Sequence, residues 1–167
     1  MQRMNSARMQ CPVARSLEQV GEWWSILILR DAFLGLTRFD EFEKSLGIAP
    51  NMLTRRLGAL VASGLLERRR YSARPPRYEY VLTERGRDFR PVLWALIAFG
   101  NKHFAPEGKS VVIIENESGA EVDPILADRA TGRVLNPTDF RPAPGPAASE
   151  RTRARYAKRA VSERSAS

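Results

Sequence analysis

The stretch DEFEKSLGIAPNMLTRRLGALVASG, residues 40–64, decides the fold. Its first half predicts a short helix that Asp40 caps and that Gly47 ends in a left-handed conformation. Pro50 then starts a second helix, because a proline fits the first helical turn, where its missing N–H is not needed. Two short helices joined by the three residues 47–49 form a helix-turn-helix.

The second helix of this pair is predicted to have one buried face and one exposed face. Leu53, Leu57 and Leu60 lie four and three residues apart, which places them on one side. The opposite side is small, polar and basic, a surface that suits the major groove, where arginine binds guanine and asparagine binds adenine. We expect the following residues to contact base edges or flanking phosphates: Asn51, Met52, Thr54, Arg55 and Arg56.

Each of these side chains has an alternative interpretation as a phosphate contact or a solvated residue. For Arg55 a base contact is favoured, since it lies nearly opposite the leucines. For Arg56, which lies nearer the buried face, the two interpretations weigh equally.

A basic β-hairpin is expected directly after the helix-turn-helix. Leu65 to Tyr71 predicts a strand, residues 72–76 a loop with two prolines, and Tyr78 to Leu82 a return strand. A hairpin of this kind is the wing of a winged helix. Its arginines are expected to bind phosphates or the minor groove, the alternative being a solvated strand. They are Arg68, Arg70, Arg74 and Arg77.

Helical patterns flank this region on both sides. A short amphipathic helix is predicted to open at Pro12, and residues 22–34 are apolar on nearly every face, as in a central helix. After the wing, Thr83 is expected to cap one long helix with a broad apolar stripe, which Pro91 bends. A stripe of that width indicates a dimer interface. The fold class is therefore α+β, mainly α with a small β wing.

Charge is concentrated along the chain. The net charge is +8, yet residues 44–77 carry eight bases against one acid, Glu67. A codon bias explains why the bases are arginines and not lysines. It does not explain why they cluster, and the cluster indicates a polyanion site. A single cysteine and a single histidine leave no zinc site and no cluster for catalysis, so no metal, cofactor or enzymatic activity is expected.

An ordered succession of motifs closely resembles the HxlR-type regulators within the MarR-like winged helix-turn-helix group. The motifs span about Cys11 to Phe104 and read Cys11-Pro12-Val13, Trp24 to Arg30, Arg38-Phe39 with Phe42, Leu53 to Leu57, Ser63-Gly64-Leu65, and Pro75 to Thr83. The resemblance implies a homodimer built from the first and last helices. It also implies binding to a pseudo-palindromic operator of double-stranded DNA.

Cys11 is a candidate redox sensor. It precedes a helix N-terminus and lies between Arg8 and Arg15, where positive charge favours the thiolate. The resemblance allows such sensing, since some family members respond to oxidants through a matching cysteine. The alternative is a small buried residue without a sensing role. A small-molecule effector held by the tryptophans and Phe99 is a further, weaker possibility.

The chain divides into four predicted segments. Residues 1–10 form a flexible arm, 11–106 the DNA-binding and dimerisation domain, 107–140 a small β extension, and 141–167 a Pro-rich linker with a basic tail that is disordered or helical on DNA. No apolar run is long enough to span a membrane, so a cytoplasmic, nucleoid-associated protein is expected.

The sequence therefore predicts a transcriptional regulator, more specifically a repressor that is open to redox control. The main alternative is a nonspecific nucleic-acid-binding or architectural protein, for which net charge alone would be the argument. A winged fold that binds only proteins is a third interpretation, against which the arginine clustering counts.

Overall fold

The computed structural model describes residues 11–164, with side chains through residue 157. The arm expected over residues 1–10 lies outside this described part. Residues Gln19–Pro124 form one compact unit, and the described residues on either side belong to a second unit. The first unit extends past residue 106, where we expected a boundary, and includes the beginning of the β extension.

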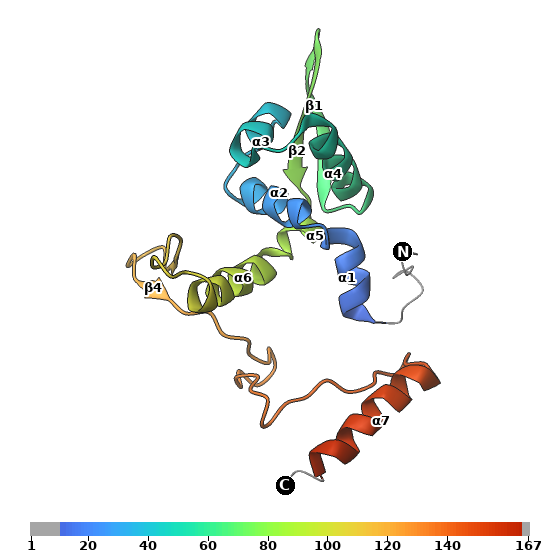
Figure 1. Cartoon of the computed structure of the whole chain (residues 1–167). Coiled ribbons are helices and arrows are strands. Elements are labelled where there is room, and N and C mark those ends of the chain that lie inside the picture. Colours follow the sequence, from blue (N-terminus) through green and yellow to red (C-terminus); the bar gives the residue numbers. More distant parts are fainter. Residues whose placement is uncertain (1–10, 165–167) are drawn as a thin grey trace. The chain divides into compact units, whose positions relative to one another are not determined.

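Helices and a hairpin follow one another along the chain in the order of a winged helix (Figure 1). The hairpin projects beyond α3 and α4. The elements are α1 Pro12–Val20, α2 Trp23–Phe33, α3 Phe39–Leu46, α4 Pro50–Ala62, β1 Leu66–Ala73, β2 Pro76–Leu82, α5 Glu84–Arg87, α6 Arg90–His103, β3 Ile113–Ile114 and β4 Glu121–Val122.

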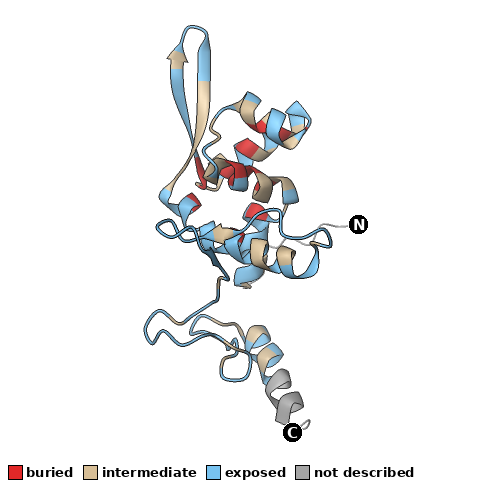
Figure 2. Cartoon of the chain, turned by 90° about the vertical axis from the view of Figure 1, so that its left-hand side faces the viewer, coloured by how far each residue is buried: buried red, intermediate tan, exposed pale blue. Residues whose placement is uncertain are grey.

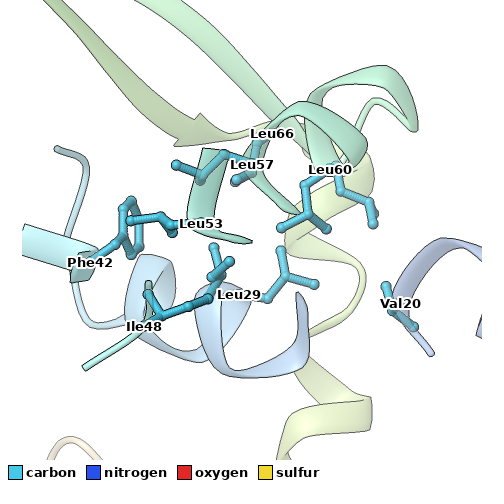
Figure 3. Close-up of a cluster of buried hydrophobic side chains, with 10 residues drawn as sticks. Val20, Leu29, Phe42, Ile48, Leu53, Leu57, Leu60 and Leu66 are labelled. Carbon is cyan, nitrogen blue, oxygen red and sulfur yellow. The ribbon is translucent and has the colours of Figure 1, made fainter. Parts of the chain in front are cut away.

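Helix α2 lies at the centre of this unit and packs against α3, α4, α6 and β2. Its apolar composition predicted that position, and the structure confirms it. The core forms where α2, α3 and α4 meet the base of the hairpin, while the outer hairpin is exposed (Figures 2 and 3). The core residues are Val20, Ile28, Leu29, Phe42, Ile48, Leu53, Leu57, Leu60, Leu65 and Leu66.

The turn between α3 and α4 has the predicted form. Gly47 adopts φ 59°, a left-handed conformation that favours glycine, and its N–H donates to the Glu43 carbonyl at 2.9 Å. Pro50 is the first residue of α4. Gly47 therefore fixes the C-terminal end of α3, and Pro50 fixes the start of α4, because the backbone conformation that each residue favours is the one its position requires.

The start of α3 differs from the prediction. The helix begins at Phe39, not after Asp40, and Glu41 satisfies its free backbone donors. The Glu41 carboxylate accepts hydrogen bonds from the N–H groups of Thr37 and Arg38, both at 2.9 Å. These bonds, that from Thr37 most, lower the pKa of the Glu41 carboxyl. A glutamate at the third position serves the helix end better here than an aspartate at the second.

The wing is longer than the sequence predicted. Strands β1 and β2 are antiparallel, with Leu66 opposite Leu82 and Ala73 opposite Pro76. Pro76 is tolerated in this ladder because it is the first residue of β2. The connector before α3 forms an isolated β-bridge between Arg38 and Glu79, and the Tyr80 N–H donates to the Thr37 carbonyl at 2.7 Å. The base of the wing is thus tied to the helix-turn-helix.

The single long helix expected from Thr83 onward is wrong. Thr83 caps the short helix α5, accepting from the Gly86 N–H at 3.0 Å, and the chain then turns before α6 begins at Arg90. Pro91 explains the break, because it has no N–H for the carbonyl of Arg87 and its ring would clash with that carbonyl in a continuous helix.

The C-terminal segments contain less regular structure than expected up to residue 140 and more beyond it. The predicted strand over residues 110–115 is reduced to β3, which pairs with β4 through a turn at Gly119, and a single bridge joins Ala127 to Val134. The basic tail, for which we expected either disorder or a helix on DNA, is helix α7 Glu150–Arg164. Its alanines and arginines are strong helix formers, which accounts for the helix.

Candidate DNA-binding surface

Helix α4 presents the predicted polar face to solvent. Leu53, Leu57 and Leu60 are fully buried and fix the rotation of the helix, so that Asn51, Thr54 and Arg55 are exposed. The N-terminal half of α4 therefore carries an amide, a hydroxyl and a guanidinium on one outward surface. These groups offer the hydrogen bonds by which side chains distinguish base edges.

Met52 and Arg55 lie beside each other at the edge of this face. Met52 is half-buried, and the Arg55 Nη2 atom is 3.5 Å from the Met52 Sδ atom. A thioether is a weak acceptor, so this contact orients the guanidinium without neutralising it. Arg55 keeps its charge and most of its donors available.

Arg56 occupies a different environment from the rest of the predicted set. Its Nη2 atom forms an ion pair with the Glu22 carboxylate at 3.1 Å, and only 12% of its side chain is exposed. Its Nε atom is buried. We therefore assign Arg56 to holding α4 against the start of α2, and we leave it out of the DNA contacts proposed below.

The C-terminal half of the exposed face of α4 consists of small residues. Gly58, Ala59 and Ala62 are all exposed. Apart from the adjacent residues and the nearby backbone of α4 itself, no described atom lies within 4 Å of the position that a Cβ atom on Gly58 would occupy. Glycine in a helix interior costs about 1 kcal/mol relative to alanine. No contact within the chain explains that cost, and Gly58 was not singled out by the sequence pattern.

The arginines of β1 are largely engaged in building the wing. The Arg68 guanidinium lies 3.6 Å from the centre of the Tyr78 ring. Arg70 donates to the Ser72 carbonyl at 3.0 Å and to the Ala73 carbonyl at 2.6 Å. These contacts hold the guanidiniums along the strands, so Arg70 in particular stabilises the bend near the tip.

Arg69 is also engaged on the same strand. Its Nη2 atom lies 2.9 Å from the Glu67 carboxylate, and this hydrogen bond lowers the pKa of the Glu67 carboxyl. The pair is exposed and contributes little to stability. The negative charge of Glu67 nevertheless offsets the positive charge of Arg69, so Arg69 attracts a polyanion less strongly than the neighbouring arginines do.

Arg74 and Arg77 are the free cations of the wing. Arg74 lies at the tip between the two strands, and Arg77 lies in β2 opposite Ser72. Both are exposed, and within the part of the chain that the structure describes neither forms an ion pair. Of the four wing arginines predicted from the sequence, these two can reach a polyanion without breaking an existing contact.

Arg38 is a basic residue of this surface that sequence reasoning did not select. It is exposed, directly precedes α3, and its guanidinium lies 5.0 Å from the centre of the Tyr71 ring. A signal was present, since a basic residue before the first helix of a helix-turn-helix stands where the DNA backbone is approached. Because Arg38 lies next to both α3 and the wing, it extends the positive charge of the wing toward the helix-turn-helix.

Cys11 has the local setting that the sequence indicated. It is half-buried and directly precedes α1, where its carbonyl accepts from the Arg15 N–H at 3.0 Å. Arg8 lies outside the described residues. Cys11 is a free thiol in the structure.

The aromatic residues considered for an effector do not gather into one site. Trp23 stacks on Trp24 with ring centres 3.8 Å apart, and Trp23 is 59% exposed. Phe99 lines a cavity of about 510 Å³ beside β3 and β4, which no tryptophan lines. That volume lies in the range of small-molecule sites. The residues 11–157 contain no cluster of metal-ligating side chains, and none of the helices described is long and apolar enough to cross a bilayer.

Comparison with protein families identifies this surface. The model of the HxlR-like helix-turn-helix family matches residues 19–108, which include the core, α4 and the whole wing. The chain belongs to the HxlR-like helix-turn-helix family. It is therefore a transcriptional regulator with a helix-turn-helix DNA-binding domain.

Relatives of this HxlR-like regulator agree with that assignment. Rv3095 of Mycobacterium tuberculosis, an uncharacterized HTH-type transcriptional regulator, is 40% identical over 135 residues, covering 80% of this chain and 85% of its own length. PA1374 of Pseudomonas aeruginosa, whose solved structure is described as that of a transcription factor, is 59% identical with a TM-score of 0.64. The similarity to PA1374 covers 87% of this chain and 99% of that one.

A redox regulator is also among the similar solved structures. HypR in its reduced form is 35% identical with a TM-score of 0.51, over 55% of this chain and 92% of its own length. Its similarity, like that of PA1374, supports the winged helix-turn-helix fold of this regulator.

Proposed function

We propose that this regulator is a homodimeric repressor that binds a pseudo-palindromic operator, with one recognition helix in the major groove of each half-site. The observation that carries the proposal is the exposed face of α4, where Asn51 and Arg55 lie opposite fully buried leucines and Thr54 is exposed at their side. Arg55 reads guanine and Asn51 reads adenine at base edges. Arg74 and Arg77 of the wing supply contacts to the backbone or minor groove.

Selection from a random-sequence duplex library tests this function. The expected result is an inverted repeat whose half-site centres lie about 10 base pairs apart, because the two recognition helices of a dimer enter successive major grooves. The alternative, a nonspecific nucleic-acid-binding protein, is favoured by the net charge of +8. It would return a library without an enriched sequence.

Dimerisation through α1 and α6 is supported by the apolar side chains that both helices expose. On α6, Trp94 is 41% exposed, Leu96 44% and Phe99 55%. On α1, Val13 and Leu17 are more than half exposed. Exposed apolar residues in this number on two helices mark an association surface. A two-fold dimer would bury them against their own copies in the partner.

A double replacement Leu96→Asp/Phe99→Asp tests the dimer. We expect it to shift the protein from dimer to monomer in light scattering after gel filtration, since charges on an interface face must be desolvated on association. Both residues are exposed, so the fold should remain intact by circular dichroism. Replacing exposed Val111 with Asp is the matched control. A dimer that survives the double replacement would contradict the proposed interface.

Cys11 is proposed as the residue through which oxidants release the operator. Its position before α1 and the similarity to the redox regulator HypR support this role. We expect diamide to weaken operator binding of the wild type and to leave Cys11→Ser unaffected. Because the chain has one cysteine, mass spectrometry of the treated wild type should show a Cys11–Cys11 disulfide between two subunits, formed as diamide takes up the two electrons and two protons of the thiols. Equal sensitivity of the wild type and Cys11→Ser to diamide would contradict a sensing role for Cys11.

Gly58 is proposed to let α4 approach the DNA closely. We expect Gly58→Ala to raise the free energy of unfolding by up to about 1 kcal/mol, since alanine favours the helix and its methyl group meets no protein atom. The same methyl group should weaken operator binding. Urea denaturation and fluorescence anisotropy measure the two effects separately. Unchanged affinity in the stabilised variant would show that the DNA does not come close to this position.

A further inference from the structure

We infer that the C-terminal helix α7 is a second DNA-contacting element, which binds phosphates without regard to sequence. The role of α7 is separate from that of the winged helix. It rests on one part of the proposed function, namely that the chain binds DNA. It assigns a role to a segment that lies outside the residues matched by the HxlR-like model.

The charge of the tail is the first observation. Residues 147–167 carry six bases against two acids, whereas residues 105–146 before them are acidic overall, with four bases against seven acids. A local excess of one sign determines what a partner experiences, more than the net charge of the chain does. The tail is thus a separate positive segment and not a continuation of a uniformly basic protein.

The described side chains of helix α7 form no apolar surface that could join a hydrophobic core. Among its described side chains, which end at residue 157, only Thr152 and Tyr156 are half-buried, and the others are exposed. A helix that is polar all round is not held by packing, and its stability comes from propensity or from a partner. A structural role in the fold therefore does not account for it.

The arginines of α7 are available to bind anions. Arg151, Arg153 and Arg155 are exposed, and none of them forms an ion pair within the part of the chain that the structure describes. The Arg153 guanidinium donates to the Pro146 carbonyl at 3.2 Å. Arg151 and Arg155 are one helical turn apart and share a side of the helix.

The acidic residues of the extension are an alternative partner for α7 within the same chain. Two of them already have cations of their own, since Glu121 pairs with Lys109 at 2.6 Å and Asp139 pairs with Arg133 at 3.3 Å. Duplex DNA offers about one phosphate charge for every 1.7 Å of its axis. A 15-residue helix is about 22 Å long, so several phosphates can be reached at once. Double-stranded DNA is therefore the partner that the tail fits.

The linker before α7 suits such a mobile contact. Residues 141–149 contain Pro142, Pro144 and Pro146, and alternating prolines favour an extended polyproline II chain. At about 3.1 Å per residue this segment spans roughly 28 Å, which lets α7 bind beside the operator without a fixed docking surface on the protein.

The test uses the full chain with Arg151, Arg153 and Arg155 replaced by Gln, which keeps helix propensity and removes three charges. The matched control places Gln at the uncharged positions Thr152, Ala154 and Ala157 of the same helix. Affinity is measured by fluorescence anisotropy on a random-sequence duplex and on a selected operator, across salt concentrations. We expect the slope of log K against log salt to become shallower by about 0.9 per lost phosphate contact, by up to about 2.7 per protomer.

The outcomes separate this inference from the proposed function. Affinity for operator and for random DNA should fall by the same factor, which leaves the specificity ratio unchanged. An unaltered salt slope, a similar loss in the Gln control, or tighter binding by the charge-free tail would each overturn the inference. If the wild type instead shows no preference for any selected sequence, the proposed function fails, while the effect of α7 on random DNA is still measurable.

Discussion

Replacing Arg55 with alanine should weaken operator binding by about 1 to 3 kcal/mol and relax the sequence preference at one base position. The guanidinium is exposed on α4, makes a weak hydrogen bond to the Met52 sulfur and forms no ion pair among the described residues, so the replacement should remove the proposed DNA contact at little cost to the fold. Affinity for each of the four base pairs at every operator position, measured by competition anisotropy, would show the relaxed position. A loss of equal size on all sequences would make Arg55 a phosphate contact.

Arg56 provides the control for this prediction, because it is the adjacent residue and has the same side chain. Its ion pair with Glu22 lies between α4 and the start of α2. Arg56→Ala is therefore expected to lower the free energy of unfolding and to preserve the base preference of whatever protein remains folded. Reversed behaviour of the two variants would mean that the exposed face of α4 is not the face that meets DNA.

Removal of both free cations of the wing should have the second large effect. In Arg74→Ala/Arg77→Ala, a dimer loses four guanidiniums that are exposed and unpaired within the described residues. If all four contact phosphates, the slope of log K against log salt becomes shallower by about 3.6. The preferred sequence should be retained, because phosphate contacts carry little sequence information. Titrations between 50 and 200 mM salt, a range over which such contacts change affinity by orders of magnitude, measure the slope.

Arg129→Ala is the matched control for the wing, since it removes an exposed arginine outside the helix-turn-helix and the wing. Its salt slope should equal that of the wild type. An unchanged slope in the double variant would exclude the wing from the DNA interface. A changed base preference would instead place Arg74 or Arg77 at base edges of the minor groove.

The sequence predicts the helix-turn-helix because its signals are local. Gly47 and Pro50 fix the turn through their own backbone preferences, and the spacing of Leu53, Leu57 and Leu60 determines which side of α4 is buried. The exposure of Asn51 and Arg55 follows from these residues, and the central position of α2 follows from its own apolar composition. The HxlR-like family match agrees with the same succession of motifs.

Contacts between distant segments could not be predicted in this way. Arg56 pairs with Glu22, which is 34 residues earlier, and the helical period places Arg56 only at the edge of the buried face. The bracing of the wing by Arg70 depends on how the strands bend near the tip. The break between α5 and α6 was underestimated because Pro91 was taken as a bend, although its clash with the preceding turn ends the helix.

The ratio of affinities for a selected operator and a scrambled duplex of the same length tests the central claim most directly. Measured at one physiological salt concentration, this specificity ratio should be at least about 10³ for the wild type. It should fall in Arg55→Ala and remain constant in Arg74→Ala/Arg77→Ala. A wild-type ratio near one would contradict sequence-specific regulation by α4 and would favour a nonspecific DNA-binding protein.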